Sequence, residues 1–237
     1  MKSPSLVLFD LGGVLVKLGS IRGLWGAKAG ARTDEELWGI WLGSEDPARV
    51  DSGKLPFRDF LGRWHHDVRP YLTLEELTRV YESLIEAPYP GALDLVRQLR
   101  DKTEVGCLSN MNACHWPQVL GLGFEGAFDR VFASHLIGHA KPSDEIFRHV
   151  LGSVPHKPGN ILFLDDNKVN VESARRHGLQ AELAKGAERF FQFGLYVTIP
   201  ADSLEELNQV AKEIDSVISS LLIIAGAGTG KTTVITR

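Results

Sequence analysis

Residues 6–15 read LVLFDLGGVL, in which four apolar residues precede one carboxylate, a leucine and two glycines. Four consecutive apolar residues predict an interior strand of a parallel sheet, because such strands are buried on both faces. Ligand sites of open α/β sheets lie just beyond the carboxyl ends of the strands. We therefore expect Asp10 to lie at a ligand site, although an acid after a strand is also typical of a turn or a helix cap. Gly12 and Gly13 would let the backbone approach an anionic ligand and adopt positive φ.

The composition bounds the class of protein. The 237 residues, of which 43% are hydrophobic, are enough for one large domain or for a domain with an insert. A formal net charge of −4 gives no broad basic surface, so nucleic acid is not expected as a partner. No apolar stretch reaches the roughly 18 residues that a membrane helix needs, and the first sixteen residues lack a signal-peptide pattern. Cys107 and Cys114 lack metal-ligand spacing, and we expect reduced thiols in a cytoplasmic protein.

Residues 17–88 show helical rather than strand periodicity. Apolar residues recur at i, i+3 and i+4 in three segments, which are residues 35–42, 57–68 and 74–85. Thr33 and Thr73 are suited to cap two of these helices, because acids follow each of them in the first turn. We expect a helical module without strands. Four tryptophans, which are Trp25, Trp38, Trp41 and Trp64, are expected to form its core, with a lining role for one or two of them in a substrate lid as the alternative.

Beyond the Pro- and Gly-containing segment 87–91, strands and helices alternate. The predicted strands are residues 105–108, 130–133 and 161–164. The predicted helices are residues 91–102, 117–122, 144–151 and 169–177. Such alternation indicates an α/β fold with a doubly wound parallel sheet, into which the helical module is inserted after the first strand.

Polar residues follow three of the predicted strands. They are Asp10, then Ser109 and Asn110, and finally Asp165, Asp166 and Asn167. A parallel sheet brings such strand ends together at one edge. Lys141 lies at the start of a predicted helix and adds a cation to the set. Taken alone, Lys141 would be a surface lysine and Asp165 part of a helix cap, but their order along the chain favours one shared site.

This set of residues suits phosphoryl transfer. Three neighbouring acids repel one another, so a divalent cation such as Mg²⁺, which prefers oxygen ligands, is the natural partner. Asp10 could attack phosphorus and form an aspartyl phosphate. Lys141 and the Ser109 hydroxyl would orient and balance the phosphoryl oxygens.

The order of these motifs resembles that of the haloacid dehalogenase superfamily of phosphohydrolases, over residues 5–186. The four matching motifs are FDLGG at 9–13, LSN at 108–110, AKP at 140–142 and FLDDN at 163–167. The resemblance implies a Rossmannoid core formed by residues 1–16 and 89–190, with a C1 cap formed by residues 17–88. Within the superfamily, the first two motifs are most similar to bacterial sugar-phosphate phosphatases of the glucose-1-phosphatase type. The phosphatase domain of epoxide hydrolases is a near relative.

The resemblance also implies roles for the site residues. It makes Asp10 the nucleophile and places Mg²⁺ between the carboxylates of Asp10 and Asp166 and the carbonyl of Gly12. It gives Asp165 a supporting place around the metal. The residues implied to hold the phosphate are Ser109, Asn110 and Lys141, with the backbone at Gly12 and Gly13.

One position departs from the superfamily pattern. Most of its phosphatases carry a second aspartate, the general acid and base, where this chain has Gly12. Losing such a group typically costs about 10²–10⁴ in rate. Three explanations remain open. The leaving group departs unprotonated, a histidine such as His65, His66 or His115 supplies the proton, or the protein binds phosphate and metal without turnover.

These observations favour a Mg²⁺-dependent phosphatase that acts on a small, sugar-phosphate-like metabolite through Asp10. Dehalogenation of 2-haloacids is the nearest chemical alternative. Metal-free dehalogenases have no need for a carboxylate pair, so Asp165 and Asp166 argue against it. A non-catalytic metal and phosphate binder is the third possibility.

A second motif lies near the carboxyl end. Residues 225–233 read AGAGTGKTT after the apolar residues 221–224, and they resemble the Walker A segment of superfamily-one helicases. Residues 195–207 look like a short piece of conjugative-transfer ATPases. Neither belongs to a phosphatase, and no Walker B acid follows. We expect a truncated or chimeric reading frame joined near residues 187–194, with residues 191–237 an extraneous tail rather than an independent P-loop module.

We expect residues after about 190 to add no ATPase activity, because one phosphate loop without a surrounding sheet and acid cannot position ATP. Phosphate release from ATP should be the same in the Lys231→Ala variant and in the unaltered protein. ATP hydrolysis that survives Asp10→Asn but is lost in Lys231→Ala would contradict this expectation.

Overall fold

The computed structural model describes residues 4–184, so the tail and its phosphate-loop motif lie outside the described residues. A five-stranded sheet has the order β5-β4-β1-β6-β7, and every neighbouring pair is parallel. The strands are β1 (Leu6–Phe9), β4 (Glu104–Ser109), β5 (Arg130–Ala133), β6 (Ile161–Asp165) and β7 (Gln180–Leu183). The predicted doubly wound α/β fold is confirmed. The edge strand β7 was not predicted, because polar residues interrupt its short apolar pattern.

The central position of β1 in the sheet explains why its four residues are all apolar. Leu6 and Leu8 pack into one hydrophobic core, whereas Val7 and Phe9 pack into another on the opposite face of the sheet. All four side chains are buried, as expected for a strand between two layers of helices. The register aligns Phe9 with Leu164 of β6. Asp10, which follows β1, therefore lies beside Asp165, the last residue of β6.

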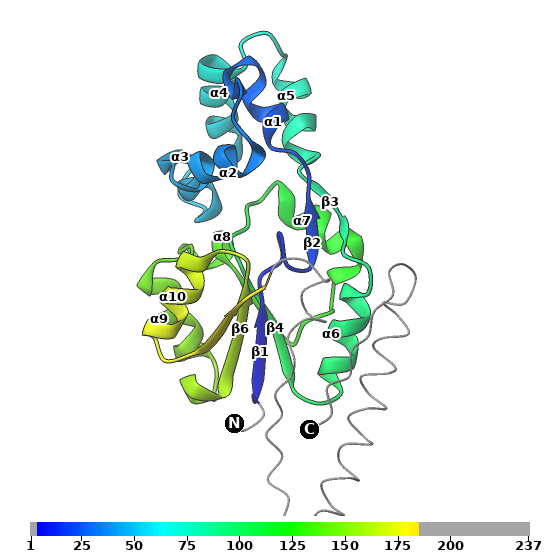
Figure 1. Cartoon of the computed structure of the whole chain (residues 1–237), viewed down its shortest axis with the longest axis vertical. Helices are drawn as coiled ribbons and strands as arrows, with labels where there is room; N and C mark the ends of the chain where they lie inside the picture. Colours follow the sequence, from blue (N-terminus) through cyan, green and yellow to red (C-terminus); the bar gives the residue numbers. More distant parts are fainter. Residues whose placement is uncertain (1–3, 185–237) are drawn as a thin grey trace, which may run out of the picture. The chain divides into compact units, whose positions relative to one another are not determined.

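Helices cover both faces of the sheet (Figure 1). Residues of α6 (Ala92–Arg100) and α7 (His115–Val119) contribute to the core on one face. Residues of α9 (Asp144–Ser153) and α10 (Lys168–Arg176) contribute to the core on the other. The short helix α8 (Ser134–Ile137) follows β5 directly. Within residues 4–184, no helix is both long and apolar enough to cross a bilayer.

Five α-helices lie between β1 and α6, and we call them the inserted helices; a short 3-10 helix (Gly26–Ala29) joins the first two. They are α1 (Arg22–Trp25), α2 (Asp34–Leu42), α3 (Glu45–Asp51), α4 (Phe57–Val68) and α5 (Leu74–Glu82). Thr33 and Thr73 form the predicted amino-terminal caps, each reciprocated by a glutamate three residues later. The inserted helices have their own hydrophobic core, which contains Trp41 and packs against the other three predicted tryptophans.

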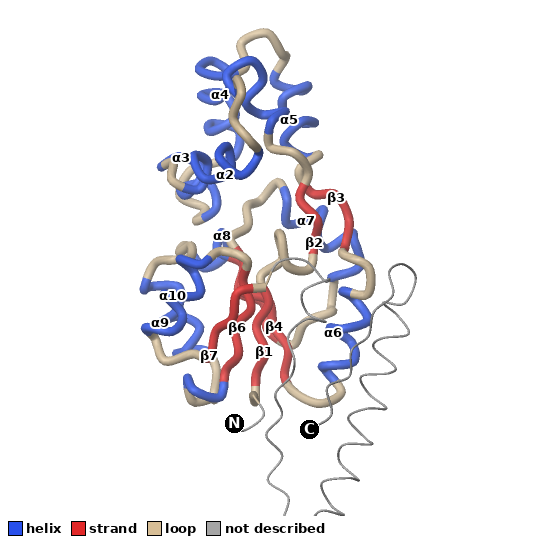
Figure 2. Tube along the Cα trace, in the orientation of Figure 1, coloured by secondary structure: helices blue, strands red, loops and turns tan. Residues whose placement is uncertain are grey.

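The prediction that residues 17–88 contain no strand is wrong. The strands β2 (Val16–Leu18) and β3 (Ile85–Pro88) form a two-stranded antiparallel sheet at the two ends of the insertion (Figure 2). Each strand is too short to show an alternating pattern, and the pairing joins segments some seventy residues apart. This sheet brings the chain back to the core at the point where it left.

Candidate functional site

Asp10 is the first residue after β1, and its position is fixed by the strand. Its backbone N–H donates to the carbonyl of Leu164, which continues the pairing of β1 with β6 for one more residue. Its carboxylate Oδ1 accepts a hydrogen bond of 2.8 Å from the backbone N–H of Leu11. The side chain is largely buried, so an acid is held against the end of the sheet rather than in bulk water.

Lys141 lies next to Asp10 and is itself buried. Its Nζ is 3.0 Å from Asp10 Oδ1 and 2.6 Å from Asp165 Oδ2, and it donates to the carbonyl of Leu108 at 2.8 Å. The three N–H groups of the ammonium thus have three acceptors. Burial lowers the pKa of Lys141, but the two carboxylates raise it by more, so the group remains a fixed cation.

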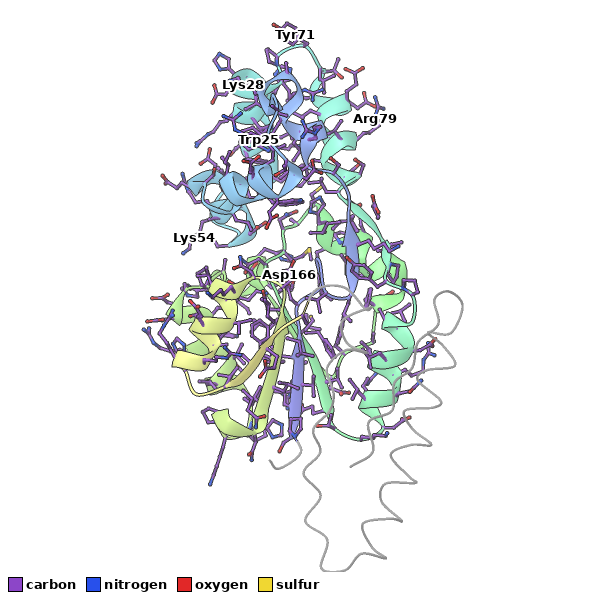
Figure 3. All side chains as sticks on the ribbon, in the orientation of Figure 1. Trp25, Lys28, Lys54, Tyr71, Arg79 and Asp166 are labelled. Carbon is purple, nitrogen blue, oxygen red and sulfur yellow. The ribbon has the colours of Figure 1, made fainter. Side chains whose placement is uncertain are left out.

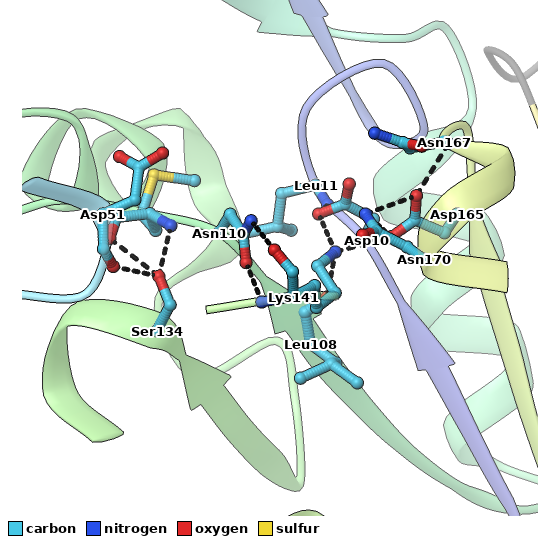
Figure 4. A network of polar contacts seen from close by, with 11 residues as sticks. Asp10, Leu11, Asp51, Leu108, Asn110, Ser134, Lys141, Asp165, Asn167 and Asn170 are labelled. Atoms are coloured by element: carbon cyan, nitrogen blue, oxygen red, sulfur yellow. Dashed lines mark hydrogen bonds and ion pairs between the residues drawn. The ribbon is translucent and has the colours of Figure 1, made fainter. Parts of the chain in front are cut away.

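Asn110 holds the backbone of Lys141 in place. Its Nδ2 donates to the carbonyl of Lys141 at 2.8 Å, and its Oδ1 accepts from the Lys141 N–H at 2.7 Å. Both ends of the amide therefore position the lysine (Figure 4). The direct contact between Asn110 and phosphate, which the resemblance implied, stays a prediction.

Asp165 is fully buried, and hydrogen bonds occupy both of its carboxylate oxygens. Oδ1 accepts from the backbone N–H of Asn167 at 2.7 Å and from Asn170 Nδ2 at 3.1 Å. Oδ2 accepts from Lys141 and, at 3.1 Å, also from Asn170. This arrangement suits a carboxylate that orients Lys141. Metal contact by Asp165 stays a prediction, and sequence reasoning missed Asn170.

Three carboxylates could hold a metal ion at this edge of the sheet. One oxygen each from Asp10, Asp165 and Asp166 lies within 4.8 Å of the other two. Gly13 makes room for this cluster, because it has φ of +74° and a Cβ there would lie 2.3 Å from Asp166 Oδ2. Figure 3 places Asp166 at the end of the sheet that faces the inserted helices. A compact set of hard oxygen donors fits Mg²⁺.

Ser109 and Gly12 complete the predicted set. Ser109 is the last residue of β4 and is buried. Burial raises the pKa of Asp10, and this effect outweighs the opposing effects of the Lys141 charge and of a hydrogen bond from Ser109. Gly12 pairs with Val16 in an isolated bridge, and a Cβ on Gly12 would lie 3.2 Å from the Leu18 side chain.

The candidate histidines form contacts elsewhere. His65 Nε2 contacts the carbonyl of Leu72, and His66 pairs with Asp67. His115 is stacked on an aromatic ring of α5, and burial lowers its pKa to about 4. Because His115 is neutral at physiological pH, it is unsuited to donate a proton.

The chain resembles a family model, two phosphatases and a solved structure. The family model described as haloacid dehalogenase-like hydrolase matches residues 4–178. The chain is similar to D-ribitol-5-phosphate phosphatase of Bacteroides thetaiotaomicron, with 26% identity over 73% of this chain and 88% of that protein. It is also similar to sesquiterpene phosphatase astK of Aspergillus oryzae, with 26% identity over 73% of this chain and 85% of that protein. A HAD family enzyme of Bacteroides thetaiotaomicron, crystallised with magnesium and inorganic phosphate, superposes with a TM-score of 0.65 and 25% identity. That match covers 78% of this chain and 96% of the other.

Proposed function

We propose that this chain, which belongs to the haloacid dehalogenase-like hydrolase family, is a Mg²⁺-dependent phosphatase of a small phosphorylated metabolite. The observation that carries the proposal is one buried lysine held between two carboxylates, Asp10 and Asp165, beside a third carboxylate, Asp166. Two curated phosphatases at 26% identity and the relative crystallised with magnesium and phosphate support it.

The reaction follows from the position of Asp10. A lone pair of its carboxylate attacks phosphorus, and the bond between phosphorus and the leaving oxygen breaks, with its electron pair going to that oxygen. Water then attacks phosphorus of the aspartyl phosphate, which releases inorganic phosphate and restores Asp10. Leu11 N–H and Lys141 hold the carboxylate oriented for attack, so little reorganisation is required during the reaction.

Asp10, Asp166 and the carbonyl of Gly12 are the residues that would hold Mg²⁺, and the bound ion would offset the negative charge of the phosphoryl group. Lys141 and the Ser109 hydroxyl supply further positive charge and hydrogen bonding at the same place. We also propose that the inserted helices act as the cap and that the cap determines substrate size and shape. A sugar-phosphate-like substrate and a cytoplasmic location stay predictions.

Removing the metal tests the proposed function. We expect the protein to release p-nitrophenol from p-nitrophenyl phosphate in Mg²⁺, and we expect EDTA to abolish this activity and added Mg²⁺ to restore it. The physical reason is that the closely spaced carboxylates repel both one another and the phosphate dianion unless a cation neutralises them. Phosphate release should follow p-nitrophenol release in equal amounts. Turnover that is undiminished in EDTA would contradict the proposal.

A dehalogenase would behave differently in the same assays. It would release chloride from 2-chloropropionate without Mg²⁺ and would leave aryl phosphates intact. We expect neither result, since Asp166 gives the site a carboxylate that metal-free displacement of chloride does not require. A screen of phosphorylated metabolites then identifies the substrate.

A further inference from the structure

Asp51 is a further acid near the site, beyond the three carboxylates of the metal cluster, and sequence reasoning did not single it out. It is the last residue of α3, and its backbone oxygen accepts a hydrogen bond from the Ser134 hydroxyl. That hydroxyl also accepts from the backbone N–H of Met111 at 2.8 Å. The end of α3 is therefore attached to the loop that follows β4. This is the loop that carries Asn110, whose amide holds Lys141.

A single amide orients the Asp51 carboxyl. Asn112 Nδ2 donates to Asp51 Oδ1 at 3.0 Å and also contacts the Tyr81 hydroxyl at 2.9 Å. The other end of this amide, Oδ1, accepts from the backbone N–H groups of Cys114 and His115 at 3.1 and 3.0 Å. These two bonds require an acceptor, so the donor end of Asn112 must face Asp51. In the view of Figure 4, Asn110 lies between Asp51 and Asp10.

The surroundings of Asp51 favour its protonated form. Among the described residues, no lysine or arginine forms an ion pair with it. Burial raises the pKa of Asp51 to about 6, the bond from Asn112 opposes this shift, and the negative charge of Asp10 adds to it. Tyr81 on α5 interacts with Asp51, and His115 on α7 contacts the same Asn112 amide; both are neutral at physiological pH. A carboxyl with a pKa near working pH is suited to move a proton.

The other groups of the site are already engaged. Lys141 donates to three acceptors, and Asp165 accepts on both oxygens. Position 12 carries no side chain, and the Leu18 side chain lies within 3.2 Å of where a Cβ would be. A leaving alkoxide nevertheless needs a proton as its bond to phosphorus breaks. Asp51 is a half-buried acid whose helix is hydrogen-bonded to the loop that positions Lys141, and it lies close enough to Asp10 to feel the negative charge of that carboxylate.

We propose that Asp51, supplied by the inserted helices, is the general acid and base that position 12 lacks. Its carboxyl proton passes to the leaving oxygen while the bond between phosphorus and that oxygen breaks. The resulting carboxylate then takes a proton from the water that attacks the aspartyl phosphate, which restores the starting state. This assignment rests on the proposed phosphatase function.

The Asp51→Asn variant tests the assignment with two substrates. The amide keeps the shape and can still accept from Asn112, but it has no proton to give as an acid. A p-nitrophenolate departs without protonation, whereas an alkoxide does not, so we compare p-nitrophenyl phosphate with n-propyl phosphate. In a two-step covalent reaction kcat/KM reports on steps up to departure of the leaving group. We expect kcat/KM to fall about 10²–10⁴-fold for the alkyl ester and less than about tenfold for the aryl ester.

The aryl ester also reports whether the variant is folded. Asp46→Asn is the matched control, because Asp46 lies on the same helix but pairs with Arg49 and Arg63 at the surface. The Asp46→Asn change should leave kcat/KM unchanged for both the alkyl and the aryl ester. n-Propyl phosphate carries no further hydroxyl, so a mere contact between Asp51 and a substrate hydroxyl would not produce the expected difference.

The unaltered enzyme offers a second measurement that needs no variant. The ratio of kcat/KM for the alkyl ester to that for the aryl ester should fall as pH rises above about 6, because Asp51 then loses its proton. The assignment would be overturned if Asp51→Asn lowered kcat/KM equally for both esters or left it unchanged for both. It would also be overturned if the ratio measured for the unaltered enzyme did not depend on pH. An unaltered protein that cleaves the aryl but not the alkyl ester also overturns it. If that protein cleaves neither ester, the proposed function fails and this assignment fails with it.

Discussion

Replacing Lys141 by methionine should both destabilise the protein and impair its activity. The side chain has similar length but no charge, so Asp10 and Asp165 would face each other in a buried site without the cation that lies between them. Removing one partner of a buried ionic network typically costs about 3–5 kcal/mol, because the remaining charge is uncompensated. Losing a preorganised positive group at a phosphoryl site typically lowers kcat by about 10²–10³-fold. Urea denaturation at neutral pH and turnover of an aryl phosphate measure the two effects.

The control for this variant is Lys168→Met. Lys168 is exposed and lies 3.7 Å from Glu172 one helical turn away, so the change should alter the free energy of unfolding by less than about 0.5 kcal/mol. The penalty in Lys141→Met arises from ionised carboxylates. Burial raises the pKa of Asp10, so lowering the pH protonates that carboxyl first, and the difference in stability from the unaltered protein should therefore shrink. A Lys141→Met variant as stable as the control would show that the lysine does not compensate the two acids.

The sequence predicted which residues meet at the edge of the sheet, because three residues of the candidate site either end a strand or directly follow one. Asp10, Ser109 and Asp165 each end or follow an apolar run, and the carboxyl ends of parallel strands meet at one edge whatever the loops between them do. Lys141 follows no strand, and its place was predicted from its order along the chain and from its motif. Its three acceptors come from three different strand ends.

The contacts of the inserted helices could not be predicted in the same way. Helix α3 has seven residues, with a proline in its first turn, and shows too few turns for a periodic pattern. Asp51 contacts Asn112, which is 61 positions further along the chain, so no short-range sequence pattern predicts this contact. Asn170 likewise contacts Asp165 from the buried face of α10. Such residues are found only when the packing of separate elements is known.

The Asp10→Asn variant should lose turnover by about four orders of magnitude or more, because an amide lacks the negative lone pair that attacks phosphorus. Its effect on stability should be the reverse of that of Lys141→Met. The unaltered site holds two buried carboxylates against one ammonium, and the pKa of Asp10 is raised mainly by burial. A carboxyl whose pKa is raised by folding favours the folded state at low pH and costs stability once pH exceeds its unfolded pKa.

The neutral amide removes this cost at neutral pH and leaves one ammonium against one carboxylate. The free energy of unfolding of Asp10→Asn, measured in EDTA at pH 7, should equal or exceed that of the unaltered protein, and the excess should vanish near pH 4. A dead enzyme that is also less stable would indicate that Asp10 supports the fold rather than the reaction. Residual activity above about one per cent would assign the attack on phosphorus to another group. Full stability together with lost turnover is the combination that a nucleophile held at the end of β1 requires.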